Sequence, residues 1–146
     1  MISNENTMYM YCNVLGQIEP EKILDIGLFY RQIGGVSRTI LNSDVPKKCF
    51  ITGIDLENSK NYGVYNTIYD EIIRTEDIAG LSDVEYDLAV FFDKKIKGLE
   101  RKNLFDFVKS NCKCIFAYET DDVYLQNWEN KRKLNVNNVT GILAWR

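Results

Sequence analysis

Three acidic residues stand within or directly after short apolar segments, where a carboxylate can meet a ligand. Asp25 lies inside the segment that ends at Gly27, Asp55 ends the segment from residue 49, and Asp93 ends the segment from residue 86. If these segments are parallel strands, their carboxyl ends meet at one edge of a sheet, where open α/β sheets bind ligands. A carboxylate there can accept two hydrogen bonds from a ribose diol, and a glycine lets the backbone approach closely. The pattern predicts a nucleotide-type site, against the alternative that Asp55 is a solvated acid at a strand end.

Acid–base chemistry in this chain has a limited choice of side chains, because the chain contains no histidine. This absence excludes Ser-His-Asp and Cys-His catalysis and every metal site that needs histidine. An acid or base must then be Asp, Glu, Lys, Tyr or Cys. Asp93 is the candidate base, with a helix cap before Lys94 as the equal alternative, and no catalytic residue is assigned.

The four cysteines are predicted to be reduced thiols, mostly buried, with no role in metal binding. Cys112 and Cys114 are close in sequence, and a strand through both would place them on one face. A four-cysteine zinc site needs two paired knuckles, and Cys12 and Cys49 do not form the second. We therefore expect no metal.

The chain alternates between short apolar runs typical of buried strands and amphipathic segments typical of helices. The predicted helices are residues 7–16, ended by Gly16, residues 34–42 and residues 99–110. Residues 71–82 are ambiguous, and residues 123–128 are left unassigned. The predicted strands are residues 22–27, 49–55, 64–69, 86–93, 113–118 and 139–145, the last paired to 133–136 across Asn137-Asn138.

This alternation predicts an α/β fold with a doubly wound, mostly parallel sheet and an antiparallel edge near the C-terminus. The length of 146 residues, with 45% apolar and 27% charged residues, favours one domain over residues 1–146. Residues 1–21 form an N-terminal helix and linker in this interpretation. Strand 22–27 is expected to be central and parallel to 49–55 and 86–92.

The strand ends resemble those of the class I S-adenosylmethionine-dependent methyltransferases. Ile23-Leu24-Asp25-Ile26-Gly27 is similar to their first motif, residues 51–55 to their second strand with its ribose-binding acid, and residues 86–93 to their fourth. The resemblance spans residues 22–145 and implies S-adenosylmethionine as cofactor and a methyltransferase-like Rossmann fold. The residues that it places near the cofactor are Asp25, Gly27, Leu28, Phe29, Asp55, Leu56, Asp70 and Asp93.

The implied roles differ from residue to residue, and several have a plain structural alternative. Asp25 orients the cofactor loop or ties that loop down through backbone amides. Asp55 holds the ribose, and the backbone after Gly27 holds the amino-acid moiety. Asp70 would be a third-strand acid near the adenine, against the alternative of a surface carboxylate. Asp93 would face the methyl-transfer site.

Two features depart from the family pattern. Its first loop is usually Gly-x-Gly-x-Gly, whereas here residues 28–33 read Leu-Phe-Tyr-Arg-Gln-Ile. Phe29 and Tyr30 are predicted to fill part of the pocket, since two exposed aromatic rings would each forfeit roughly 1.5–3 kcal/mol of burial. Residues 56–63 are also too few for a crossover helix before a strand at 64–69, because such connections need about a dozen residues.

The charge pattern argues against several classes of partner. The net charge of −3 does not attract a polyanion, and acids lie near the basic run 131–133, so we expect no nucleic acid. The run 94–102 is interpreted as a solvated face rather than a phosphate site.

No apolar run reaches the roughly 18 residues of a membrane span. Residues 1–6 lack signal-peptide features, which predicts a cytoplasmic protein.

Three functions remain open at this stage. The first is a methyltransferase-like domain acting on a small molecule, with weak or lost activity because of the bulky loop. The second is a non-catalytic Rossmann-type binding or assembly module, as a homodimer. The third is a domain for another nucleotide, such as a dinucleotide or nucleotide-sugar, which the lack of Gly-x-Gly-x-x-Gly disfavours.

Overall fold

A computed structural model describes residues 5–27, 49–56, 69–74, 77–78, 83–91, 99–118, 125–137 and 139–146. Predictions that fall between these ranges, including the helix at 34–42 and the loop at 28–33, lie outside the described residues. Within the described ranges, no helix is both long enough and apolar enough to cross a membrane.

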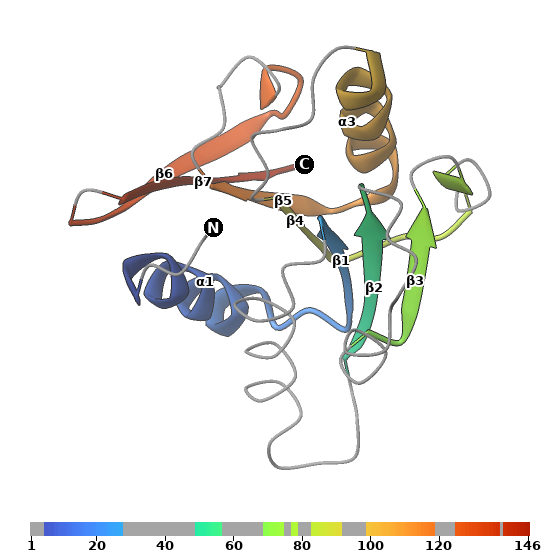
Figure 1. Cartoon of the computed structure of the whole chain (residues 1–146). Coiled ribbons are helices and arrows are strands. Elements are labelled where there is room, and N and C mark those ends of the chain that lie inside the picture. Colours follow the sequence, from blue (N-terminus) through green and yellow to red (C-terminus); the bar gives the residue numbers. More distant parts are fainter. Residues whose placement is uncertain are drawn as a thin grey trace.

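One seven-stranded sheet organises the chain, in the order β3-β2-β1-β4-β5-β7-β6 (Figure 1). The strands from β3 to β5 in this order pair in parallel, and β7 runs antiparallel to both of its neighbours. This confirms the doubly wound sheet with a central first strand and an antiparallel edge. The strands are β1 Lys22–Ile26, β2 Phe50–Asp55, β3 Glu71–Arg74, β4 Leu88–Phe91, β5 Cys114–Tyr118, β6 Asn130–Val136 and β7 Val139–Trp145.

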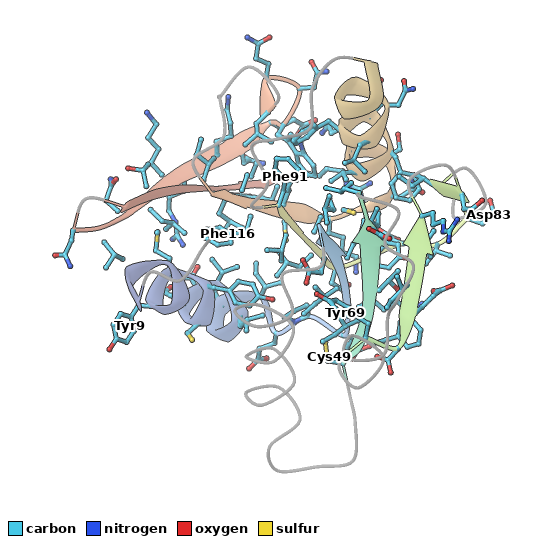
Figure 2. The ribbon with its side chains drawn as sticks, viewed as in Figure 1. Tyr9, Cys49, Tyr69, Asp83, Phe91 and Phe116 are labelled. Atoms are coloured by element: carbon cyan, nitrogen blue, oxygen red, sulfur yellow. The ribbon has the colours of Figure 1, made fainter. Side chains whose placement is uncertain are left out.

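Among the described residues, the helices α1 (Glu5–Ile18) and α3 (Leu99–Asn111) lie on opposite faces of the sheet (Figure 1). A cluster of buried side chains packs on each face, one including Phe116 and the other Phe91 (Figure 2). Successive residues of β1 alternate between them, with Ile23 in the α1 cluster and Leu24 in the α3 cluster. Burial on both faces is why the central strands are continuous apolar runs in the sequence.

The end of α1 differs from the prediction. The helix continues through Gly16 to Ile18, and Glu19 then adopts a left-handed φ of 49°. A glycine within a helix lowers its stability but does not by itself end it, whereas Pro20 lacks the N–H that a further turn needs. The backbone N–H of Glu19 still donates to the carbonyl of Leu15 over 2.9 Å.

The third strand also differs from the prediction. It is Glu71–Arg74, in the stretch that the sequence left ambiguous, and residues 64–68 lie outside the described residues. Four residues are too few for a hydrophobic period to distinguish strand from helix. The connection from β2 to β3 is therefore residues 56–70, long enough for a parallel crossover, and that departure from the family pattern disappears.

The cysteine prediction is confirmed in one part and wrong in another. All four thiols are free, and Cys49, Cys112 and Cys114 are buried. Cys112 does not continue the strand of Cys114: its N–H donates to the carbonyl of Val108 at the end of α3. Cys114 packs in the α1 cluster and Cys112 in the α3 cluster, so the two do not share a face.

Exchanging two glycines for alanine is expected to move stability in opposite directions. A Cβ at Gly141 would lie 2.8 Å from the ring of the buried Phe116, so Gly141→Ala should destabilise the fold by about 1–3 kcal/mol. A Cβ at Gly16 meets nothing within 4 Å, so Gly16→Ala should stabilise α1 by about 0.5–1 kcal/mol. Urea unfolding of both variants measures the two shifts, and equal effects would contradict this packing.

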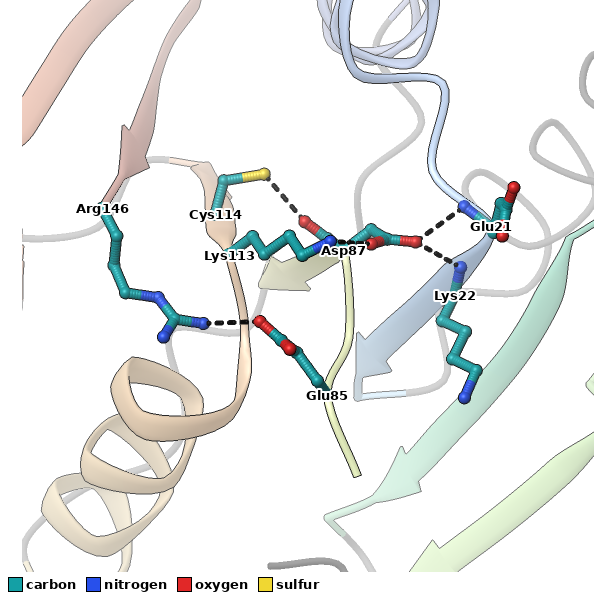
Figure 3. Close-up of polar contacts among 7 residues, drawn as sticks. All are labelled: Glu21, Lys22, Glu85, Asp87, Lys113, Cys114 and Arg146. Atoms are coloured by element: carbon teal, nitrogen blue, oxygen red, sulfur yellow. Dashed lines mark hydrogen bonds and ion pairs between the residues drawn. The ribbon is translucent and has the colours of Figure 1, made fainter. Parts of the chain in front are cut away.

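A polar cluster joins the amino ends of β1, β4 and β5, at the edge opposite to Gly27 and Asp55 (Figure 3). One carboxylate oxygen of Asp87 accepts hydrogen bonds from the N–H groups of Glu21 and Lys22, over 2.9 and 3.0 Å. Its other oxygen lies 3.1 Å from the ammonium of Lys113. Burial raises the pKa of Asp87, but the hydrogen bonds and Lys113 outweigh it and hold that pKa below its usual value.

Removing this carboxylate should destabilise the protein in a pH-dependent way. At neutral pH, Asp87→Ala leaves two N–H groups without their acceptor and should cost about 1–3 kcal/mol. Because the folded-state pKa is lowered, the wild-type advantage is full above the unfolded pKa of about 4 and is lost as pH falls through the folded value. Urea unfolding from pH 7 to pH 3 tests this, with the exposed Asp106→Asn as control. A difference that stays constant or grows toward low pH would contradict it.

Candidate functional site

The carboxyl ends of β1 and β2 bring together three of the residues that the sequence singled out. Gly27 follows β1 with φ of 108°, and its N–H donates to the carbonyl of Ile54 over 2.9 Å. A side chain at such a φ would be strained, so this turn requires glycine. Asp55 ends β2 with only 2% of its surface exposed, and the half-buried Leu56 follows it.

The order in which strands are added to the sheet reverses beside β1, so its carboxyl end lies at a topological switch point. From β1 the chain adds β2 and β3 on one side and then returns to add β4 on the other side of β1. Ligands of open α/β sheets bind at the carboxyl ends of strands beside this reversal. The position next to the reversal is Gly27, at the end of β1, with the Asp55 carboxylate on the neighbouring strand.

Asp25 is completely buried within β1, and its carboxylate accepts a hydrogen bond from the hydroxyl of Tyr69. Its register partner on β2 is Gly53, so the position across from it on that face carries no side chain. Asp55 lies two residues beyond Gly53, and alternation puts the side chains of Asp25 and Asp55 on the same face. Tyr69 reaches this face from the segment just before β3 (Figure 2).

No sequence pattern points to Tyr69 as the partner of Asp25. The predicted third strand at 64–69 includes Tyr69 and assigns it no role at the site. A buried carboxylate needs hydrogen-bond donors, so an acid inside an apolar strand is itself the signal that a donor such as tyrosine must come from elsewhere. Which tyrosine supplies it depends on the crossover to β3, and sequence pattern does not specify that path.

Asp70, another predicted site residue, is not brought to this edge. Asp70 precedes β3 at its amino end, where its carboxylate accepts the N–H of Ile51 and its own N–H donates to the Ile51 carbonyl, both over 2.9 Å. Beyond the carboxyl end of β3, the acid that the structure describes is Asp77, which is exposed and lies three residues after the strand. Leu28, Phe29 and Asp93 lie outside the described residues, and their roles stay predictions.

Cys112 and Cys114 do not supply a nucleophile. Burial raises the pKa of Cys114 to about 12 and also raises that of Cys112. Both thiols are therefore protonated at neutral pH, and the thiolate is the reactive form. Within the described ranges, no group of three or more acidic or cysteine side chains is placed to hold a metal ion.

Comparison with solved structures finds the same fold in methyltransferases. The sugar O-methyltransferase CalS11 of calicheamicin biosynthesis, which acts on TDP-rhamnose, superposes with a TM-score of 0.69 at 15% identity, covering 99% of this chain and 81% of its own. The O-methyltransferase TomG from Streptomyces achromogenes, solved with S-adenosylmethionine, gives a TM-score of 0.63 at 12% identity, covering 97% and 80%. No protein-family model matches the chain, and a search of curated proteins finds no match.

Sheet order, parallel core and antiparallel edge therefore define a methyltransferase-like Rossmann fold, as the sequence resemblance implied. The fold is not restricted to one reaction. A protein from Methanobacterium thermoautotrophicum described as precorrin 8w decarboxylase superposes with a TM-score of 0.58 at 15% identity, covering 95% of this chain and 90% of its own. Activity must be argued from the site.

Proposed function

We propose that the edge formed by Gly27, Asp55 and Leu56 binds S-adenosylmethionine. The observation that carries this proposal is the almost fully buried carboxylate of Asp55 beside the left-handed turn at Gly27. The residues fit the cofactor, because a strand-end carboxylate accepts hydrogen bonds from ribose hydroxyls and the turn has no Cβ to exclude a ligand. The amino-acid moiety would lie against the backbone after Gly27, near Leu28 and Phe29.

The reaction we propose is methyl transfer to a small molecule. S-Adenosylmethionine supplies a methyl group already activated by the sulfonium, so the protein chiefly has to align acceptor and donor. Asp93 remains the candidate to accept a proton from the acceptor molecule, as no histidine is present. A nucleic acid acceptor is disfavoured by the net charge of −3.

We further propose that activity is weak or lost. The argument rests on the sequence of the loop 28–33, which places bulky residues where the family has glycines. The alternative function, a non-catalytic binding or assembly module, shares this argument. Its other support was the short connection after β2, which the position of β3 removes. Binding of S-adenosylmethionine is therefore the better supported of these two functions.

Titration calorimetry with S-adenosylhomocysteine, NAD and a nucleotide-sugar in parallel tests the proposed cofactor. We expect binding of S-adenosylhomocysteine alone. Binding of one of the other two would reassign the site to that nucleotide. No binding at millimolar ligand would favour the non-catalytic module.

The loop argument makes a separate prediction. Replacing Phe29 and Tyr30 together by glycine should strengthen S-adenosylhomocysteine binding, because side chains that fill the pocket no longer have to be displaced. Calorimetry of the double variant measures the gain, and circular dichroism checks that the variant is folded. A folded variant that binds no better would show that these rings do not occlude the site.

A further inference from the structure

A hollow lies at the edge of the sheet opposite to Gly27 and Asp55, at the amino ends of β1, β4 and β5. Its volume is about 770 Å³, within the range of roughly 300–1,000 Å³ that small-molecule sites occupy. Its wall includes the apolar side chains of Ile18, Leu143 and Trp145, and Trp145 is 37% exposed. An exposed tryptophan in such a hollow offers a flat apolar surface to a ligand.

Both acidic and basic side chains line this hollow. Glu19 and Glu21 lie between α1 and β1, and Arg132 of β6 reaches across to Gln17 of α1. Asp87 and Lys113 neutralise each other in the ion pair of Figure 3. The last carbonyl groups of α1 add partial negative charge near Glu19.

Arg132 keeps donors for a ligand. It donates to the Gln17 side chain over 2.6 Å, whereas Arg146 pairs over 3.3 Å with Glu85, which is not among the residues that line the hollow. A guanidinium has five N–H donors, so one contact leaves several for a carboxylate.

Glu19 contradicts two local rules at this hollow. Its φ of 49° is left-handed, a conformation that favours glycine or asparagine at the end of a helix. It also places a negative charge at the helix C-terminus, where cations are favoured, and the last turn of α1 holds no basic residue. Asn137, the other described non-glycine residue with positive φ, is of a type that suits its turn. A residue that lowers stability in two ways is a candidate for a binding role.

We propose that this hollow binds a zwitterion of the amino-acid class, with an apolar side chain. Its ammonium contacts Glu19 and Glu21, its carboxylate contacts Arg132, and its side chain lies against Trp145. A hollow lined by two acids and an arginine suits a ligand that carries both charges, and the apolar wall favours an aliphatic or aromatic group. The site is separate from the proposed cofactor edge and does not rest on it.

The experiment is a titration of the full chain with L-phenylalanine, followed by calorimetry and by tryptophan emission, to which the exposed Trp145 and the buried Trp128 both contribute. Phenethylamine lacks the carboxylate, and 3-phenylpropionate lacks the ammonium. We expect saturable binding of phenylalanine and at least about tenfold weaker binding of each analogue, the loss expected when a charge-assisted hydrogen bond is missing. No binding at millimolar phenylalanine, or equal binding of either analogue, would overturn the proposal.

Variants of Glu19 separate a binding role from a structural one. Glu19→Gln and Arg132→Gln should each weaken phenylalanine binding, with Asp106→Asn on α3 as a charge-matched control that leaves it unchanged. Glu19→Gly should raise the midpoint of thermal unfolding, because it relieves the left-handed φ, and should weaken binding in the same protein. Wild-type affinity in both Glu19 variants would contradict the proposed contact.

Discussion

Asp55→Ala is expected to weaken binding of S-adenosylhomocysteine by about 1–3 kcal/mol, which is about 5- to 150-fold in Kd. The carboxylate ends β2 beside Gly27 and is 2% exposed, so the protein shields it from solvent. A hydrogen bond to an ionised acceptor in such a place is stronger than one between neutral groups. Calorimetry of wild type and variant under the same conditions measures the difference.

Two further variants make this result specific. Asp55→Asn keeps one acceptor oxygen and loses the charge, so its affinity should fall between those of wild type and Asp55→Ala. Glu71→Gln changes an exposed acid at the amino end of β3 and should bind as wild type. Unchanged affinity in a folded Asp55→Ala protein would remove this residue from the site.

The part of the fold that sequence predicted well is the part buried on both faces. β1, β2, β4 and β5 are continuous apolar runs, and such runs are typical of central parallel strands. The hairpin of β6 and β7 could be predicted because Asn137 tolerates the left-handed turn between them. β3 failed because it stands at the sheet edge with four residues and an exposed first and last position.

The candidate site likewise has a part that could be predicted from the sequence and a part that could not. Gly27 and Asp55 could be predicted because each is fixed by its own strand end, and the sheet then brings the two together. The site role predicted for Asp70 depends on a strand that ends just before it, at residue 69. The observed strand β3 begins just after it, at Glu71. The hollow at the opposite edge depends on side chains from four elements and the segments that flank them, and no local pattern links Glu19 to Arg132.

The last prediction concerns Tyr69, whose hydroxyl donates a hydrogen bond to the Asp25 carboxylate. Tyr69→Phe should destabilise the fold by about 1–3 kcal/mol, because it leaves a buried carboxylate without the hydroxyl that donates to it. The control is Tyr9→Phe, which removes a hydroxyl from a tyrosine 62% exposed and should change stability by less than about 0.5 kcal/mol.

Combining Tyr69→Phe with Asp25→Asn tests whether the cost arises from this contact. A neutral amide is less costly to bury than a carboxylate, so the Tyr69→Phe loss should be smaller in the Asp25→Asn background. Urea unfolding of the four proteins gives the interaction free energy directly. If that energy is zero, Tyr69 stabilises the protein through packing alone, and the carboxylate two residues before Gly27 is held in place by other groups.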